Sequence, residues 1–290
     1  MTSVFHDAAL SDAERRERLY RGDLFVYSPT PGTLELCALA TEMLEEAFAP
    51  HHPTEAQFHL PVDEFAKILA ALKPAFIHHP RSKQAIRQIL EERGCDPEKT
   101  YFDVPRLRTS TAQGYLTTGI AFAFHPHRDT WYSAPFCQLN WWMPVYPVES
   151  DNVMALHPHY WDHPVKNDSH VYNYQEWVKH SRFTASQHVG KDTRVQPTPQ
   201  EEVALDPQVR VLAPPGGMMI FSGAQLHSSV PNTTRRMRVS IDFRTVHLDD
   251  VRERRGAPNV DSRCTGTTMG DYLRATDLAH VPDELIAMYL

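Results

Sequence analysis

The sequence has little of what marks several large protein classes. It holds four cysteines in 290 residues, none spaced as CxxC, which argues against a disulfide framework or a zinc knuckle. The formal net charge of −7 argues against a nucleic-acid partner. No apolar run approaches the ~18 residues of a membrane span, and the first residues lack the basic and apolar regions of a signal peptide. These absences favour an enzyme of the cytoplasm without a membrane anchor.

Internal repeats and low-complexity segments are also missing. Apolar residues make up 41% of the chain and charged residues 22%, as in ordinary globular enzymes. The length suits one large domain with a substantial core. We therefore expect a single domain over residues 1–290.

Residues 1–99 have the pattern of helices that support a sheet. Ser11 and Glu14 form a capping-box pattern at the start of one helix. Apolar residues at helical spacing predict three more, over about 33–47, from Pro61 to at least Leu72, and over about 82–93. Together these ranges predict an N-terminal helical region.

From about residue 100 to 247 the pattern changes to short β-branched and aromatic runs. The candidate strands are 101–108, 117–124, 136–146, 151–156, 208–213, 217–222, 227–231 and 237–246. Such strands without intervening helices predict a mainly β fold, a sandwich or barrel, with flanking helices. The insertion at about 157–200 is expected to act as a lid. Residues 248–290 form a turn-rich tail with a short helix near its end.

The stretch from Phe124 to Trp131 carries the first candidate site. In an extended chain, His127 and Asp129 lie on one face, where both can reach one cation. His227, from a distant strand, would complete a set of two imidazoles and one carboxylate, which is typical of non-haem Fe(II) oxygenases. An isolated His-x-Asp pair is equally compatible with an ordinary surface loop.

A second candidate site follows His227. Arg238 and Ser240 share one face of a predicted strand, and a guanidinium with a hydroxyl suits a carboxylate ligand. Asp242 lies on the same face and is expected to pair with this arginine or another. The alternative for Arg238 is a solvated strand residue.

These parts together resemble a known family. His127-x-Asp129, the distant His227 and Arg238-x-Ser240 resemble the motifs of Fe(II)/2-oxoglutarate-dependent dioxygenases. Three shorter segments are similar to the phytanoyl-CoA dioxygenase-like branch, namely 129–132, 140–144 and 222–227. The resemblance covers roughly residues 100–247.

The resemblance implies a double-stranded β-helix (jelly-roll, cupin-like) core over 100–247, with iron bound by His127, Asp129 and His227. It also implies that 2-oxoglutarate chelates the iron and pairs its distal carboxylate with Arg238, assisted by Ser240 or Ser229. Reaction with O2 would release succinate and CO2 and oxidise, most simply hydroxylate, a C–H bond of a small metabolite or a natural-product intermediate of secondary metabolism. Related halogenases replace the carboxylate ligand by a small residue, so Asp129 argues against halogenation.

Other residues are candidates for the pocket. Gln138, Asn140 and Trp142 share a strand face, so the amides could bind 2-oxoglutarate and Trp142 could form a wall. Alternatively, the opposite face is the core and the amides meet solvent. In the lid, Tyr160 and Trp161 are candidates to cover the substrate, together with Tyr172, Tyr174 and Trp177.

The histidine-rich segments leave alternatives open. His125 stands two residues before His127 and could bind metal, although the family spacing favours His127. His157, His159 and His163 could bind zinc, as in a zinc hydrolase. They are also explained as polar groups of a mobile lid. A non-catalytic, cupin-like binding protein is the remaining alternative, and the sequence predicts neither the substrate nor the oligomeric state.

Overall fold

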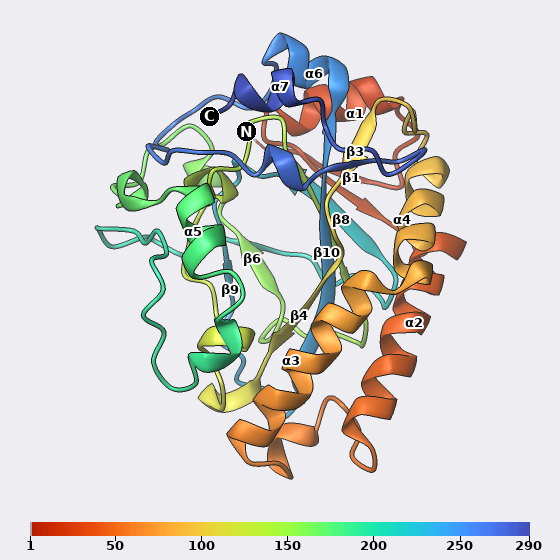
Figure 1. Ribbon diagram of the computed structural model, residues 1–290, viewed down its shortest axis with the longest axis vertical. Coiled ribbons are helices and arrows are strands. Elements are labelled where there is room, and N and C mark those ends of the chain that lie inside the picture. Colours follow the sequence, from red (N-terminus) through yellow and green to blue (C-terminus); the bar gives the residue numbers. More distant parts are fainter. Residues whose placement is uncertain (1) are drawn as a thin grey trace.

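The computed structural model describes residues 2–290, which form a mixed sheet-and-helix structure (Figure 1). The α-helices are α1 (Asp12–Leu19), α2 (Pro31–Phe48), α3 (Val62–His78), α4 (Pro80–Glu92), α5 (Tyr174–His180), α6 (Leu248–Glu253) and α7 (Asp283–Ala287). The strands are β1 (Val4–His6), β2 (Leu24–Tyr27), β3 (Thr100–Phe102), β4 (Arg106–Ser110), β5 (Leu139–Pro144), β6 (Met154–Leu156), β7 (Val209–Arg210), β8 (Met218–Ser222), β9 (His227–Ser229), β10 (Arg238–His247) and β11 (Leu273–Arg274).

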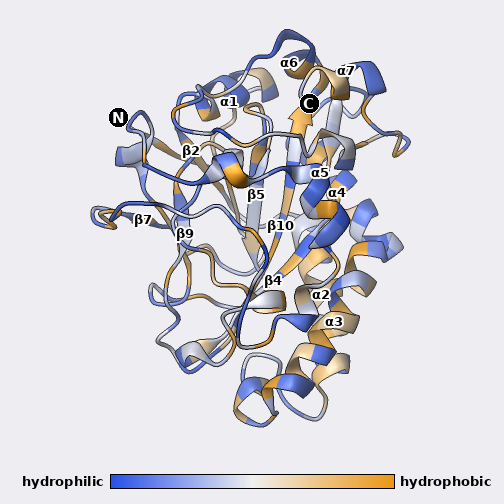
Figure 2. Ribbon diagram, turned by 60° about the vertical axis from the view of Figure 1, so that its left-hand side comes forward, coloured by the Kyte–Doolittle hydropathy of each residue, from blue (hydrophilic) through white to orange (hydrophobic). Residues whose placement is uncertain are grey.

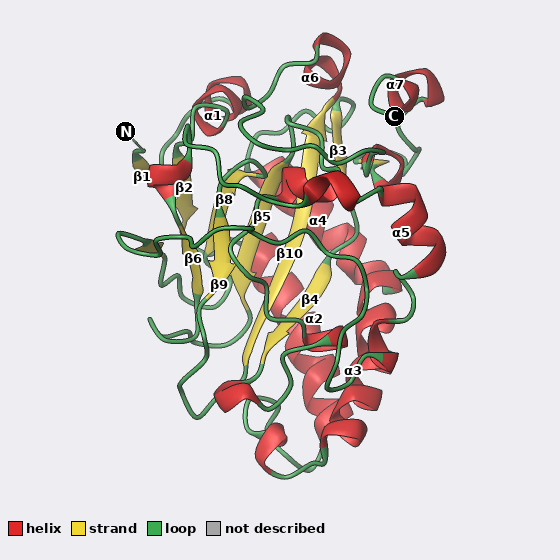
Figure 3. Cartoon of the chain, turned by 90° about the vertical axis from the view of Figure 1, so that its left-hand side faces the viewer, coloured by secondary structure: helices red, strands yellow, loops and turns green. Residues whose placement is uncertain are grey.

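The strands form two sheets (Figure 3). The main sheet has eight strands in the order β1-β2-β8-β5-β10-β3-β11, with β4 also paired to β10. The second sheet has the order β7-β6-β9, and a bridge between His127 and His227 extends it beyond β9. All strand pairs are antiparallel except β1 with β2.

The chain passes back and forth between the sheets. β4, β5, β8 and β10 lie in the main sheet, whereas the His127 segment, β6, β7 and β9 lie in the second. Side chains from both sheets meet in one apolar cluster that includes Trp142, Met154, Leu156, Met219 and Phe221. One face of the main sheet therefore looks toward the second sheet.

The other face of the main sheet packs against α2, α3 and α4 (Figure 1). Alternate residues such as Trp141, Ile241 and Phe243 point into this helix-covered core. The same helices carry both hydrophobic and hydrophilic turns in Figure 2, as expected when one side is buried. Because both faces of β5 are covered, all six of its residues are buried, and its polar side chains do not reach solvent.

The helices of the first hundred residues agree with the patterns in the sequence. Ser11 caps α1, and the reciprocal contacts with Glu14 complete the capping box. Gly94 follows α4 with φ of +67°, the left-handed conformation in which glycine is favoured. The same region also contains two strands, β1 and β2, that the helical interpretation missed. Residues 24–27 are apolar and fully buried, and they extend the main sheet by pairing with β8.

Two of the expected strands differ in the structure. Residues 117–124 form no strand but contain a 3-10 turn at Gly119–Ala121, and Gly119 has φ of +59°. A side chain at Gly119 would stand 2.4 Å from the carbonyl oxygen of Ala185 in the lid, so the backbone here is covered by the insertion. The strand expected over 101–108 is divided into β3 and β4 by Pro105, which has no amide hydrogen for the ladder.

The part of the insertion that carries α5 lies on the opposite side of the main sheet from α2 (Figure 1), whereas its turn Ala185–Gln187 contacts α3. Its regular structure is limited to α5 and short 3-10 turns. In the tail, α6 extends to Glu253, where turns were expected, and α7 is the predicted terminal helix. Within residues 2–290, no helix is long and apolar enough to cross a bilayer.

Candidate metal centre and ligand cavity

The backbone brings His127 and His227 side by side. Each residue donates its backbone N–H to the carbonyl oxygen of the other, both at 2.9 Å. Arg128 is extended, with φ of −110° and ψ of 142°, and Asp129 begins the 3-10 turn Asp129–Tyr132. The expected period of two therefore holds across His127 and Asp129, and both side chains face the space between the sheets.

The three side chains converge on one carboxylate oxygen. Asp129 Oδ1 lies 3.6 Å from His127 Nε2 and 3.7 Å from His227 Nε2. All three residues are buried, and their ligand atoms lie within 4.8 Å of one another. Among residues 2–290, no other three His, Cys, Asp or Glu side chains come together in this way.

Backbone carbonyls fix the orientation of both imidazoles. His127 Nδ1 lies 2.8 Å from the carbonyl oxygen of His125, and His227 Nδ1 lies 2.9 Å from that of Gln225. Since a carbonyl only accepts, each Nδ1 carries the hydrogen, and the neutral form of each ring then presents an Nε2 lone pair toward Asp129. Burial, followed by the nearby His127, lowers the pKa of His227 to about 3. His227 is thus neutral, the form that binds a metal.

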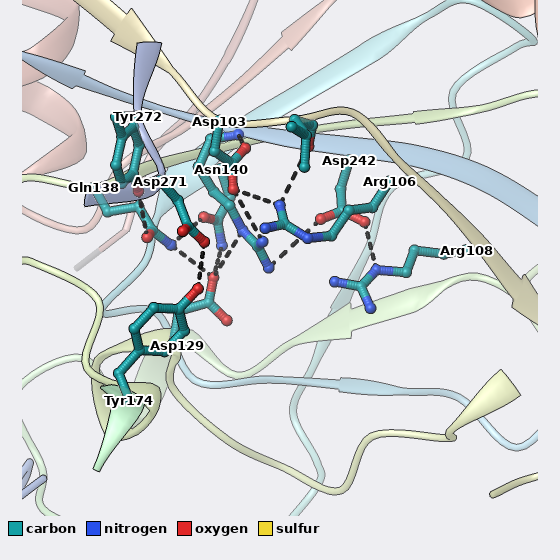
Figure 4. Close-up of polar contacts among 12 residues, drawn as sticks. Asp103, Arg106, Arg108, Asp129, Gln138, Asn140, Tyr174, Asp242, Asp271 and Tyr272 are labelled. Carbon is teal, nitrogen blue, oxygen red and sulfur yellow. Dashed lines mark hydrogen bonds and ion pairs between the residues drawn. The ribbon is translucent and has the colours of Figure 1, made fainter. Parts of the chain in front are cut away.

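The second oxygen of Asp129 is occupied by protein donors (Figure 4). The side-chain amides of Gln138 and Asn140 both donate to Oδ2 at 2.8 Å, and Arg244 Nε lies 3.8 Å from the same atom. Burial alone would raise the pKa of Asp129, but the contact with His127 and the charge of Arg244 hold it well below its ordinary value. Asp129 is therefore ionised, with Oδ1 left for a cation.

Tyr272 completes this arrangement from the C-terminal tail. Its hydroxyl donates to Gln138 Oε1 at 2.7 Å, which leaves the Gln138 amide nitrogen facing Asp129. Gln138 and Asn140 were candidates to bind 2-oxoglutarate, and in the structure their amide nitrogens donate to Asp129. No pattern in the sequence pointed to Tyr272. Arg244 could have been found from the sequence, because it shares the strand face of Arg238.

Arg238 lies on the same inner face of β10 but has a different environment. It is buried, and its Nε has no hydrogen-bond partner among the described residues. Burial lowers the pKa of its guanidinium to about 10, so the group is still charged at neutral pH. Ser240 is also buried, and its hydroxyl lacks a partner in the same part of the chain.

The Arg238 guanidinium lies close to the ring of Trp142 on the neighbouring strand β5. The guanidinium carbon lies 5.9 Å from the centre of the Trp142 ring, and Trp142 pairs with Asp242, further along β10. Trp142 is buried between the sheets, where the sequence placed a pocket wall. Ser229 follows His227 by two residues on β9, so it lies on the same inner face.

The lid aromatics occupy positions that differ from the expectation. Trp161 lies over Gly22, where an added Cβ would stand 2.6 Å from the indole, so Trp161 covers the N-terminal region instead of the metal centre. Tyr160 packs in a separate cluster with Trp131 and Leu226. Neither residue covers the triad.

Two other tyrosines connect the lid to the triad. The ring centre of Tyr132 lies 5.4 Å from that of His127, and Tyr172 from the lid lies 5.3 Å from Tyr132. Tyr132 was not singled out in the sequence, although it belongs to the motif 129–132. Tyr172 is buried and Tyr132 is half-buried, and both rings lie on the lid side of the site.

The alternative histidine cluster is not assembled. His157 is buried and bonded, with Nε2 3.0 Å from Ser228 Oγ and Nδ1 3.2 Å from the carbonyl of Leu205. His163 is exposed beside Asp162. His125 is also exposed and contributes its backbone carbonyl, not its ring.

Arg128, between the two ligand positions, anchors the surroundings of the site. It is buried, and it donates to the carbonyls of Ala224, Tyr160 and His163 and to the carboxylate of Asp261 at 3.1 Å. Asp261 in turn accepts from the Trp131 indole at 2.7 Å. This buried ion pair ties the lid and the tail to the turn that carries Asp129.

The chain was compared with known proteins. No family model matches it, and no curated protein matches its sequence significantly. Similar solved structures include the apo form of the non-heme monooxygenase ThoJ, with 15% identity, TM-score 0.41 and coverage of 80% of this chain and 76% of that one. The non-heme alpha ketoglutarate dependent epimerase SnoN from nogalamycin biosynthesis has 14% identity, TM-score 0.38, and coverage of 81% and 84%.

A further similar structure is EvdO2 from Micromonospora carbonacea var. aurantiaca complexed with 2-oxoglutarate. It has 12% identity, a TM-score of 0.46, and coverage of 82% of this chain and 92% of that one. These likenesses are loose in both sequence and superposition. The side chains of the site, and not these likenesses, therefore carry the functional conclusion.

Proposed function

We propose that this protein is an Fe(II)- and 2-oxoglutarate-dependent oxygenase that oxidises, most simply hydroxylates, a C–H bond of a small molecule. One observation carries the proposal. The inner face of β10 runs from a complete set of metal-ligand atoms at Asp129 to a buried, charged Arg238 whose Nε is unpartnered. A metal ion at the one end and a guanidinium at the other are the two positive centres that a chelating dicarboxylate requires.

The residues present fit an iron ion. Two neutral imidazole nitrogens and one carboxylate oxygen on one side of a cation form the facial set of non-haem Fe(II) oxygenases. His127 and His227 would supply the nitrogens and Asp129 Oδ1 the oxygen. The retained carboxylate favours oxygen chemistry over halogenation, because it occupies the position that a halide would need.

The residues at the other end fit the distal carboxylate of 2-oxoglutarate. A guanidinium is a good partner for a carboxylate, and a buried charge without a partner is costly. Arg238 and Ser240 would both gain hydrogen bonds on binding, and Ser229 lies on the facing sheet to assist. When bound, iron and 2-oxoglutarate supply the oxidant from O2, with release of succinate and CO2.

The chain's own residues prepare this chemistry. Gln138 and Asn140 hold Asp129 Oδ2, so that Oδ1 keeps its direction toward the two histidines. Tyr132 and Phe124 cover the His127 ring and exclude water from that side. The carbonyls behind each imidazole hold the hydrogen at Nδ1, so that Nε2 is the ligand atom of the neutral ring. Preorganised groups of this kind spare the cost of arranging ligands at each turnover.

The strand order supports a jelly-roll core as part of the same proposal. Four strands of the main sheet, β8-β5-β10-β4, face four segments of the second, β7-β6-β9 and the His127 segment. A chain that alternates between two four-stranded sheets is the pattern of a double-stranded β-helix. We infer that this core carries the site within one catalytic domain.

The proposal is tested by adding Fe(II) and 2-oxoglutarate under anaerobic conditions and recording the visible spectrum. We expect a metal-to-ligand charge-transfer band, and, after O2 is admitted, succinate formation that requires all three reactants. Asp129→Ala should lose both signals. A wild-type protein that forms neither the band nor succinate would leave a jelly-roll binding protein as the better description.

A further inference from the structure

We propose that Arg108 is the recognition group for a carboxylate on the substrate, so that the substrate is a carboxylic acid with an apolar body. This assignment rests on the proposed oxygenase function and adds the substrate class to it. Arg108 lies on β4 opposite Ser240 of β10, with its side chain on the inner face of the main sheet. It is not part of the metal set or of the site proposed for 2-oxoglutarate.

The guanidinium of Arg108 is only partly committed. Its Nε donates to Asp242 Oδ1 at 2.7 Å, and neither terminal nitrogen donates to another group within residues 2–290. In Figure 4 the single dashed line from Arg108 leads to Asp242. The side chain is 33% exposed, and the two terminal nitrogens lack an acceptor among residues 2–290, which leaves their N–H groups for a ligand. Their paired N–H groups match the two oxygens of a carboxylate.

The position of Arg108 connects this open end to the metal centre. Its guanidinium carbon lies 5.5 Å from the centre of the Phe124 ring, and that ring stacks on His127 with centres 4.9 Å apart. A carboxylate held by Arg108 would therefore place the adjoining carbon chain along Phe124. One aromatic ring separates the anchor from the proposed iron ligand, which suits a substrate whose reacting C–H lies a few bonds from its acid group.

The local charge also favours an anion. The inner face and its margin carry four arginines, Arg106, Arg108, Arg238 and Arg244, against three aspartates, Asp103, Asp129 and Asp242. Asp242 is shared, because Arg244 Nη2 lies 3.5 Å from its other oxygen. Iron(II) and doubly ionised 2-oxoglutarate cancel each other's charge, so the positive surplus persists in the loaded site.

Arg108 and Arg238 lie on the adjacent strands β4 and β10 and on the same face of the main sheet, since Arg108 is opposite Ser240, two residues beyond Arg238. Their guanidiniums have different neighbours. That of Arg238 lies near Trp142 of β5, whereas that of Arg108 lies near Phe124. A dicarboxylate that fills the Arg238 end therefore leaves Arg108 available.

The test uses calorimetric titration of three probes with one carbon skeleton: 3-phenylpropanoate, 3-phenylpropanol and 3-phenylpropyl phosphate. Each is added anaerobically to the protein with Fe(II) and saturating 2-oxoglutarate, so that the Arg238 end is occupied. We expect the carboxylate to bind at least about tenfold more tightly than the alcohol, as for a hydrogen-bonded charged group. Equal binding of acid and alcohol, or tighter binding of the phosphate ester, would overturn the assignment.

Substitutions of Arg108 test whether this side chain causes the preference for the carboxylate over the alcohol. Arg108→Gln should reduce the affinity for 3-phenylpropanoate to that for the alcohol, and Arg108→Lys should recover part of it. Arg81→Gln is the matched control, because Arg81 has a similar exposure of 38% and pairs with acids far from the site. Undiminished binding to Arg108→Gln would refute the proposal.

The two proposals fail in different measurements. The charge-transfer band is recorded before any probe is added, and its absence from the wild-type protein would count against the oxygenase function. The acid-to-alcohol affinity ratio is measured by heat and does not depend on the band. An intact band in Arg108→Gln with loss of carboxylate binding supports the substrate class specifically.

Discussion

The two ends of the inner face of β10 differ in how well their polar groups are satisfied. At the Asp129 end, Gln138 and Asn140 donate to one carboxylate oxygen, and Tyr272 fixes the amide of Gln138. At the other end, Arg238 Nε and Ser240 Oγ are buried without a partner in the described chain. Arg244, which lies beside Asp129, and Arg238 are six positions apart on β10, so this one strand joins a completed polar network to an incomplete one.

The difference distinguishes a site whose ligand stays bound from a site whose ligand is replaced in each turnover. Buried polar groups are nearly always hydrogen-bonded, so exceptions need an explanation. The Asp129 network needs only a cation to balance its remaining lone pairs. The Arg238 end lacks an anion, and an anion that is consumed in each turnover must leave and be replaced. This contrast predicts different responses to substitution.

The largest effect is expected at the completed end. Asp129→Ala or His127→Ala removes one of three metal ligands and should reduce succinate formation below detection. The control for folding is the thermal unfolding profile, which should remain cooperative. Turnover that survives both substitutions would remove the triad from the proposal.

Arg238→Ala tests the incomplete end. Loss of one partner of a buried charge pair costs ~2–5 kcal/mol, so the affinity for 2-oxoglutarate should fall by roughly two to four orders of magnitude. Fe(II) binding should change little, because the triad is intact. The two affinities are measured by anaerobic titration. An unchanged 2-oxoglutarate affinity would refute the role of Arg238 and the proposed difference between the two ends of the inner face.

Arg238→Met sharpens the contrast without any ligand. It replaces a buried guanidinium that lacks an ion-pair partner by an apolar group of similar length. Urea unfolding without 2-oxoglutarate should show a gain of about 1–3 kcal/mol, since removal of a costly buried charge stabilises the fold. Addition of 2-oxoglutarate should stabilise only the wild-type protein. A destabilised variant would mean that Arg238 is already satisfied.

Tyr272→Phe should have a smaller effect at the completed end. Gln138 would lose the hydroxyl that orients its amide, and Fe(II) affinity should fall by up to about tenfold, the lower limit for groups that support metal ligands. Tyr289→Phe is the matched control, because its hydroxyl donates to the carbonyl of Val251 in another part of the fold. Equal Fe(II) affinities in the two variants would contradict the positioning role.

The smallest effect is expected in the lid. His159→Ala and His163→Ala should leave Fe(II)-dependent succinate formation within about twofold of wild type, as for surface changes away from the site. His163 is exposed, and neither residue joins a group of three metal ligands within residues 2–290. A zinc-dependent, O2-independent hydrolysis abolished by these changes would favour the zinc alternative.

The sequence predicted the parts of the site that follow from local geometry. The period of two in an extended chain placed His127 beside Asp129 and Arg238 beside Ser240. Helical periodicity and the capping box located α1, α2, α3 and α4 to within a few residues. These features depend on neighbours in the chain, so one sequence is enough to predict them.

Features that depend on distant contacts were not predictable in this way. Gln138 and Asn140 were placed on the correct face, but their donors go to Asp129, a choice that only the folded arrangement decides. Trp161 was a candidate to cover the substrate because it is an aromatic residue of the lid, and no local pattern predicts that it lies over Gly22. Tyr272 acts across 134 positions of the chain, beyond the reach of any periodicity.

The contact between Tyr272 and Gln138 has a consequence for the order in which the protein is made. A ribosome synthesises the chain from residue 1 onward, so the two histidines and Asp129 emerge well before the tail. Asp261 and Tyr272, which hold Arg128 and Gln138, follow those two residues by 133 and 134 positions. The supports of the proposed metal site are therefore complete only after Tyr272 has been made, and a chain that stops before it lacks them.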